Sequence, residues 1–141
     1  ILLGAQAGVM RQVENLKMGR KDAFGATKDT PWQMHVEGCL VEMALGKYLG
    51  VYWSGKGKLR APDVGEVDVR GTPLLHGRLM IHKEDPNDRI FWLVCGRNGS
   101  YEVKGWIKGI DAKEDKWWSD PTKTKRFAYF VPQDALNEYV D

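Results

Sequence analysis

Residues 90–107, with the sequence IFWLVCGRNGSYEVKGWI, decide the fold: two apolar runs are joined by the pair Asn98-Gly99. An Asn-Gly pair between such runs is a strong signal of a β-hairpin, because both turn positions need a positive φ. The run at 90–95 is also the longest uninterrupted apolar stretch of the chain. A membrane-spanning helix needs roughly 20 apolar residues, so the sequence predicts a sheet and no membrane span.

Further short apolar runs flank this hairpin on both sides. Runs of roughly four to eight residues bounded by turn-forming residues are typical of strands, and the cluster Pro86-Asn87-Asp88 is such a boundary. Short helices are predicted at 111–118, where Pro121 follows, and at 133–140. Besides the run at 90–95, strands are predicted at 66–70, 78–82, 101–107 and 127–131.

Two longer helices are predicted before the strands. Residues 5–18 repeat apolar side chains at helical spacing. Residues 31–49 begin with a proline in the first helical position and end before Gly50. This second helix is apolar around most of its circumference, which is typical of a buried helix, yet it carries Glu42. A carboxylate on a buried helix needs a partner, a metal or a functional reason.

The composition is that of a globular protein. The 141 residues are 43% hydrophobic and 28% charged, with a net charge of +2. We expect a single domain over 1–141, with an N-terminal helix and loop at 1–30 and a core at 31–141. The fold class is α+β, or mixed α/β, with a mixed, mostly antiparallel sheet flanked by helices. Cys39 and Cys95 are expected as core thiols, and no secretory pattern is recognised, so we expect a cytoplasmic location.

Several catalytic motifs are absent from the sequence, among them the phosphate-binding P-loop, the dinucleotide-binding glycine motif, HExxH and GxSxG. What remains is a group of acidic residues. Glu66, Asp68 and Arg70 alternate along a predicted strand and share one face, which is either a solvated edge or a site. Carboxylates that hold Mg²⁺ or Mn²⁺ beside a cation are suited to phosphodiester cleavage, because the metal polarises the phosphate and activates a water.

The order of these residues resembles the PD-(D/E)XK, or restriction-endonuclease-like, nuclease superfamily. A helix carries Val41-Glu42-Met43-Ala44, Pro62-Asp63 follows, and Asp68-Val69-Arg70 lies on a strand. The chain also looks like small proteins carried by phages, in which a later Gly-Trp-Ile segment corresponds to Gly105-Trp106-Ile107. The resemblance covers residues 30–131 and implies a restriction-endonuclease-like fold.

The resemblance also implies roles for individual residues. Asp63 and Asp68 would be metal ligands, and Glu42 would support the metal or its water. Arg70 stands where the family has lysine, so it can stabilise negative charge but not easily release a proton. The implied cofactor is Mg²⁺ or Mn²⁺.

A second segment matches the (D/E)XK part of the same motif. Glu102-Val103-Lys104 lies on a predicted strand after the Asn-Gly turn. Its partner acid would be Asp85 or Asp88, but the strand at 90–95 carries no acid. We therefore rank this alternative below the first.

Basic residues gather in two places. Lys56, Lys58 and Arg60 come just before Asp63 and are expected to position backbone phosphates. Between residues 113 and 129 short groups of basic and aromatic side chains are interleaved, a pattern that suits either nucleic-acid binding or ordinary solvated loops.

The leading hypothesis is a metal-dependent DNA endonuclease or exonuclease-like phosphodiesterase, encoded by a phage and acting in the host cytoplasm. The alternative is a catalytically inactive module on the same fold that binds nucleic acid or a protein. A third is an assembly protein that uses some of its six tryptophans at an interface. DNA is the expected partner, and a homodimer is an expected state.

Overall fold

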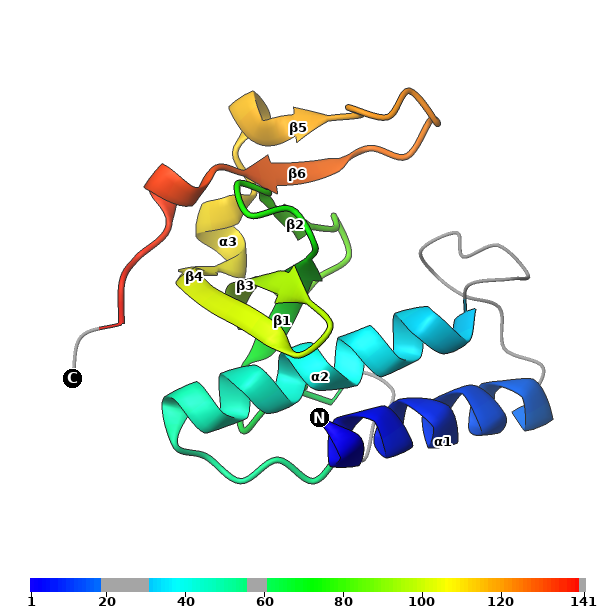
Figure 1. Ribbon diagram of the computed structural model, residues 1–141. Coiled ribbons are helices and arrows are strands. Elements are labelled where there is room, and N and C mark those ends of the chain that lie inside the picture. The colour runs from blue at the N-terminus through cyan, green and yellow to red at the C-terminus, as the bar shows by residue number, and fades with distance from the viewer. Residues whose placement is uncertain (19–30, 56–60, 140–141) are drawn as a thin grey trace. The chain divides into compact units, whose positions relative to one another are not determined.

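The computed structural model describes residues 1–18, 31–55 and 61–139. The chain divides into two compact units, Ile1–Gly65 and Glu66–Asp141. The first unit is helical, and the second contains the strands (Figure 1). The expected mixed α+β class is confirmed, while the restriction-endonuclease-like arrangement and the single domain over 1–141 stay predictions.

In the first unit, α1 (Leu2–Met18) packs against α2 (Pro31–Leu49). The backbones approach closely because Gly4 and Gly8 face α2: a Cβ atom at Gly8 would lie only 2.4 Å from the Cα of Val36. Helix α1 begins three residues before the start of the helix predicted at 5–18. The second helix is confirmed, and Gly50, with a φ of 67°, follows its last residue.

The predicted Asn-Gly hairpin forms the larger sheet of the second unit. Strand β3 (Ile90–Arg97) pairs antiparallel with β4 (Ser100–Lys108), and the turn residues Asn98 and Gly99 have φ values of 55° and 89°. Strand β1 (Asp68–Thr72) lies parallel to β3 on its other side, so the order is β1-β3-β4. The strand predicted at 66–70 therefore begins and ends two residues later than expected.

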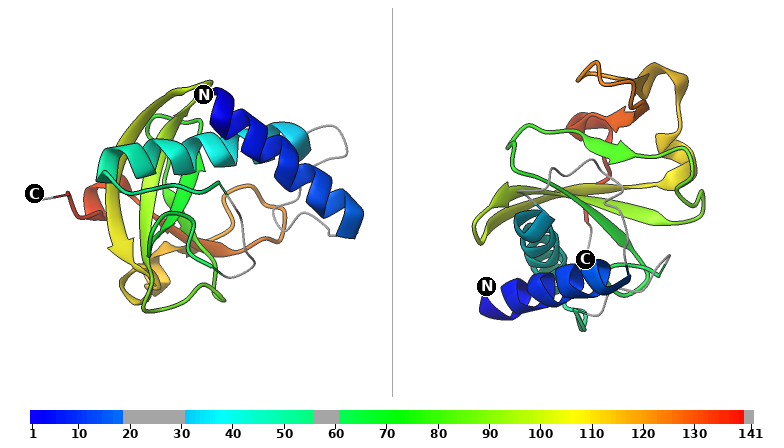
Figure 2. Two further views of the ribbon diagram at one scale, coloured as in Figure 1. Left: turned by 90° about the horizontal axis from the view of Figure 1, so that it is seen from below. Right: turned by 90° about the vertical axis from the view of Figure 1, so that its right-hand side faces the viewer.

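A second sheet contains β2 (Leu79–Ile81), β6 (Ala128–Val131) and the short β5 (Trp118–Ser119). Both pairings are antiparallel, in the order β2-β6-β5 (Figure 2). One hydrophobic core joins the two sheets, because alternate residues of β2, β3 and β6 face it. Its largest members are Leu79, Ile81, Phe91, Leu93, Ile107 and Val131.

Two of the predicted helices are wrong. The segment 111–118 contains the end of the four-residue helix α3 (Gly109–Ala112), the 3₁₀ turn η1 (Asp115–Trp117) and the start of β5. The segment 133–140 begins with the 3₁₀ turn η2 (Gln133–Ala135), after which the described chain is not helical. Asn137 instead exchanges two backbone hydrogen bonds with Trp106 of β4, at 2.9 and 2.8 Å. The β-bridge replaces helical bonds, because tertiary pairing overrides weak local propensity.

The described helices do not include one that combines the length and apolar character needed to cross a membrane.

Candidate functional site

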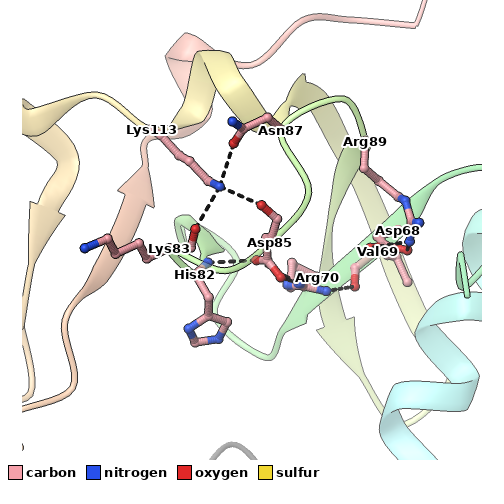
Figure 3. Close-up of polar contacts among 9 residues, drawn as sticks. All are labelled: Asp68, Val69, Arg70, His82, Lys83, Asp85, Asn87, Arg89 and Lys113. Carbon is pink, nitrogen blue, oxygen red and sulfur yellow. Dashed lines mark hydrogen bonds and ion pairs between the residues drawn. The ribbon is translucent and has the colours of Figure 1, made fainter. Parts of the chain in front are cut away.

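Strand β1 places two of the predicted site residues, and both are engaged in ion pairs. Asp68 is buried, and both of its carboxylate oxygens accept hydrogen bonds from Nη1 of Arg89, at 3.2 and 3.3 Å (Figure 3). Arg70, two residues along the strand, donates from Nη2 to both carboxylate oxygens of Asp85, at 3.1 and 3.0 Å. The Arg70 guanidinium also lies 5.0 Å from the ring centre of Phe91. Both side chains therefore link β1 to later segments of the second unit.

The loop that carries Asp85 is fixed by Lys113. The ammonium group donates to the carbonyl oxygens of Lys83 and Asp85 and to Oδ1 of Asn87, at 2.9, 2.6 and 2.7 Å (Figure 3). The Asp85 carboxylate also accepts a hydrogen bond from the backbone N–H of His82 at 2.7 Å. Lys113 thus uses its three donors inside the protein, so this basic residue of the predicted 113–129 stretch has a structural role.

In the first unit, Glu42 is also paired. The carboxylate is buried and accepts two hydrogen bonds from Arg11, at 2.6 and 2.7 Å, and a third from Nε1 of Trp53 at 3.1 Å. This paired geometry is the strong form of an arginine–carboxylate interaction. It supplies the partner that a carboxylate on a buried helix requires.

Asp63 belongs to the same electrostatic group. Hydrogen bonding to Glu42 raises the pKa of Arg11, burial opposes this, and the negative charges of Glu42 and Asp63 raise the pKa further. Burial raises the pKa of the Cys39 thiol to about 11, while Arg11 acts to lower it. In the first unit, Glu42 therefore contacts the guanidinium of Arg11 directly, whereas Asp63 acts on it only through its charge.

The predicted site residues are divided between the two units. Glu42 and Asp63 belong to the first unit, and Asp68 and Arg70 belong to the second. The predicted phosphate-binding residues Lys56, Lys58 and Arg60 lie outside the described residues, so their role stays a prediction.

Among the residues that the structure describes, no group of three or more histidine, cysteine, aspartate and glutamate side chains is arranged to hold a metal ion. The carboxylates of Glu42 and Asp68 accept hydrogen bonds from guanidinium groups, so the negative charge of each is already matched by an arginine. The described residues of either unit taken alone therefore do not fit a magnesium centre.

The alternative segment on β4 is paired internally. Lys104 forms an ion pair with Glu102, two residues before it on the strand. Asp85, one of the two acids considered as a partner for this segment, accepts hydrogen bonds from Arg70. Within the described residues, neither segment is therefore assembled as a set of metal ligands.

Sequence reasoning missed the cations that face the acidic residues. Arg11 lies 31 positions from Glu42, Arg89 lies 21 from Asp68, and Arg70 lies 15 from Asp85. The one signal available was the buried carboxylate of Glu42, which requires a partner without identifying it.

Comparison with known proteins gave no relative. No family model matches the chain, and no significant match was found among curated proteins or solved structures. The resemblance to PD-(D/E)XK nucleases therefore stays a prediction.

Proposed function

We propose that this protein binds nucleic acid without cleaving it, as a catalytically inactive module with the residue order of a PD-(D/E)XK nuclease. The observation that supports the loss of catalysis is the pairing of the expected site residues. Glu42 is held by Arg11, Asp68 by Arg89, and Arg70 by Asp85.

These pairs oppose metal binding for an energetic reason. The side chains of Asp68 and Glu42 are 11% and 7% exposed, and their arginine partners are 19% and 21% exposed. Removing one partner of a buried pair costs about 3–5 kcal/mol, because the other charge is left uncompensated. A metal that took Asp68 from Arg89 would carry such a cost.

The nucleic-acid part of the proposal rests on the resemblance and on basic side chains. Lys123, Lys125 and Arg126 are exposed, and their side chains make no hydrogen bond or ion pair with the described residues. Free cations at a surface release counterions from a nucleic acid and so drive salt-dependent binding. The predicted basic residues at 56–60 would add to this charge.

Binding and cleavage should be measured together on the full chain. Fluorescence anisotropy with labelled single-stranded and duplex DNA, in EDTA and at two salt concentrations, should show binding that weakens as salt rises. Incubation of the same DNA with Mg²⁺ or Mn²⁺ should leave it uncut. Metal-dependent cutting that disappears in Asp68→Asn would overturn the inactive assignment, and absence of binding to every DNA would overturn the whole proposal.

The metal-dependent nuclease is the competing candidate, and one observation favours it. Glu42 and Asp63, two of the residues that the family resemblance assigns to the metal site, both belong to the first unit, and the charge of each raises the pKa of Arg11. If this position serves a metal in the active protein, Asp63→Asn should abolish cutting while Glu66→Gln, which removes an exposed acid outside β1, should not. The expected homodimer stays a prediction. Sedimentation velocity of the full chain would measure its oligomeric state directly.

A further inference from the structure

Three aromatic side chains gather on one face of the β5–β6 hairpin. Trp118 pairs with Tyr129 across the two strands, and their ring centres are 4.8 Å apart. Trp118 also stacks on Phe127, with ring centres 5.9 Å apart and planes inclined by 20°. Figure 1 shows the two strands and the orange loop that joins them. The three rings form one continuous aromatic group, which we call the hairpin platform.

The hairpin platform continues the core face of the sheet into solvent. Tyr129 is opposite Ile81, and Val131, two residues further on β6, is opposite Leu79. These aliphatic residues are fully buried, whereas Trp118 is 39% and Phe127 is 53% exposed. Tyr129 therefore anchors the platform to the core, and the outer two rings are accessible. Burial of large aromatic side chains is normally favoured, so two neighbouring exposed rings indicate a surface that contacts a ligand.

The loop beside the platform is held in a defined shape by Asp120. Its carboxylate accepts hydrogen bonds from the backbone N–H groups of Thr124 and Lys125, at 3.3 and 2.8 Å. Its carbonyl oxygen accepts a third from the N–H of Lys123 at 3.1 Å. Lys123 and Lys125 have φ values of 54° and 60°, a strained conformation for non-glycine residues that persists where the surroundings enforce it.

The loop carries three cations close in sequence to the aromatic rings. Lys123, Lys125 and Arg126 lie within the four residues before Phe127, and the carboxylate of Asp120 accepts hydrogen bonds from the loop backbone. By contrast, Lys116 on the preceding turn forms an ion pair with Glu114. The loop therefore carries a net positive charge, because its three cations outnumber the single carboxylate of Asp120.

We propose that the hairpin platform and its loop bind single-stranded nucleic acid, with bases stacked on Trp118 and Phe127 and phosphates near Lys123, Lys125 and Arg126. The inference rests on the proposed function and names its substrate class. Bases in a duplex already stack on one another, so an exposed aromatic surface favours unpaired bases. Adjacent cations attract the backbone, and this combination is typical of single-strand binding without sequence preference.

The test compares single-stranded and duplex oligonucleotides by fluorescence anisotropy, using the full chain and labelled oligothymidylate. The wild-type protein should bind the single strand more tightly than the duplex. Phe127→Leu should weaken single-strand binding about 5- to 100-fold, because base–aromatic stacking is lost. Tyr52→Leu, which alters an exposed aromatic residue of the other unit, is the matched control and should bind as wild type does.

Charge is tested separately from stacking. The double variant Lys123→Gln and Lys125→Gln should lower the slope of log affinity against log salt by about 1.4, while Lys108→Gln, an exposed lysine on β4, should not change it. Far-ultraviolet circular dichroism checks that each variant is folded. Trp118→Phe should keep the binding but remove part of the tryptophan quenching that a stacked base causes.

The outcomes separate this inference from the function on which it rests. If the wild type binds nucleic acid and both the Phe127 and the lysine variants bind equally well, the hairpin assignment is wrong and the proposed function survives. Loss of binding in the lysine variant alone would overturn the stacking role of the platform. If the wild type binds no nucleic acid, both proposals fail.

Discussion

At the scale of single residues, arginine–carboxylate ion pairs hold three of the predicted site residues. Arg11 with Glu42, Arg89 with Asp68, and Arg70 with Asp85 place opposite charges where water is largely excluded. Each partner of such a pair compensates the charge of the other. Removing one partner is costly, because the remaining buried charge has lost its hydration.

A double-mutant cycle on Arg11 and Glu42 measures this effect. Arg11→Met and Glu42→Gln should each lower the free energy of unfolding by about 3 kcal/mol, since each leaves a partner without its charge. The double variant should lose less than the two single losses added together. Urea unfolding followed by circular dichroism gives the values, and additive losses would show that the pair is not coupled.

Cys39 gives a pH dependence whose sign follows from its burial. Burial raises the pKa of its thiol from 9.0 to about 11, so the folded state holds the proton more tightly than the unfolded chain. As pH rises from about 9 to about 11, the unfolded chain therefore loses its proton first and stability falls, by about 2 kcal/mol.

Unfolding curves of wild type and Cys39→Ala, recorded across this range, check the prediction. Lysine and tyrosine residues titrate alike in both proteins. The difference in stability between wild type and variant therefore isolates the effect of the thiol. The stability of the wild type relative to the variant should decline between pH 9 and pH 11. A constant difference would contradict the assignment.

At the scale of elements, glycine decides how closely the helices of the first unit approach. A Cβ atom at Gly8 would lie 2.4 Å from Val36 Cα, whereas one at Gly38 of α2 would meet nothing within 4 Å. Gly8→Ala should therefore separate α1 from α2 and cost about 1–3 kcal/mol. Gly38→Ala should instead stabilise by up to about 1 kcal/mol, because alanine favours the helix.

Thermal unfolding of these two variants forms a matched test, since the same methyl group is added to a helix in each. Opposite shifts of the melting temperature are expected. Equal shifts would mean that close packing at Gly8 does not determine the helix pair.

At the scale of the whole molecule, the two units carry different parts of the predicted nuclease site. Neither unit alone assembles a metal centre from its described residues. A ligand that binds only the folded state raises the melting temperature, so excess Mg²⁺ reports directly on such a site.

The expected result is the same melting temperature in EDTA and in excess Mg²⁺. A higher melting temperature in Mg²⁺ than in EDTA would reveal a metal site if Asp63→Asn or Asp68→Asn removed the difference. That result would restore the nuclease candidate. Asp134→Asn, an exposed acid in η2, provides the control for a general effect of charge.

Part of the local structure of this protein could be predicted from neighbouring residues. The Asn98-Gly99 turn and the long second helix were predictable because each depends on neighbouring residues: a turn that needs two positive φ values, and an apolar repeat bounded by proline and glycine. The short helix expected at 133–140 was not, because a bridge between Asn137 and Trp106 competes with helical bonds.

The chemistry of the acidic residues depends on contacts between distant parts of the chain. The sequence singled out Glu42, Asp63, Asp68 and Arg70, but it contained no signal for the partner that each would meet. Glu42 and Arg11 are 31 positions apart, and Asp68 meets Arg89 after the chain returns to pair β1 in parallel with β3. Local periodicity records which face a side chain takes, whereas long-range pairing depends on how distant segments share one core.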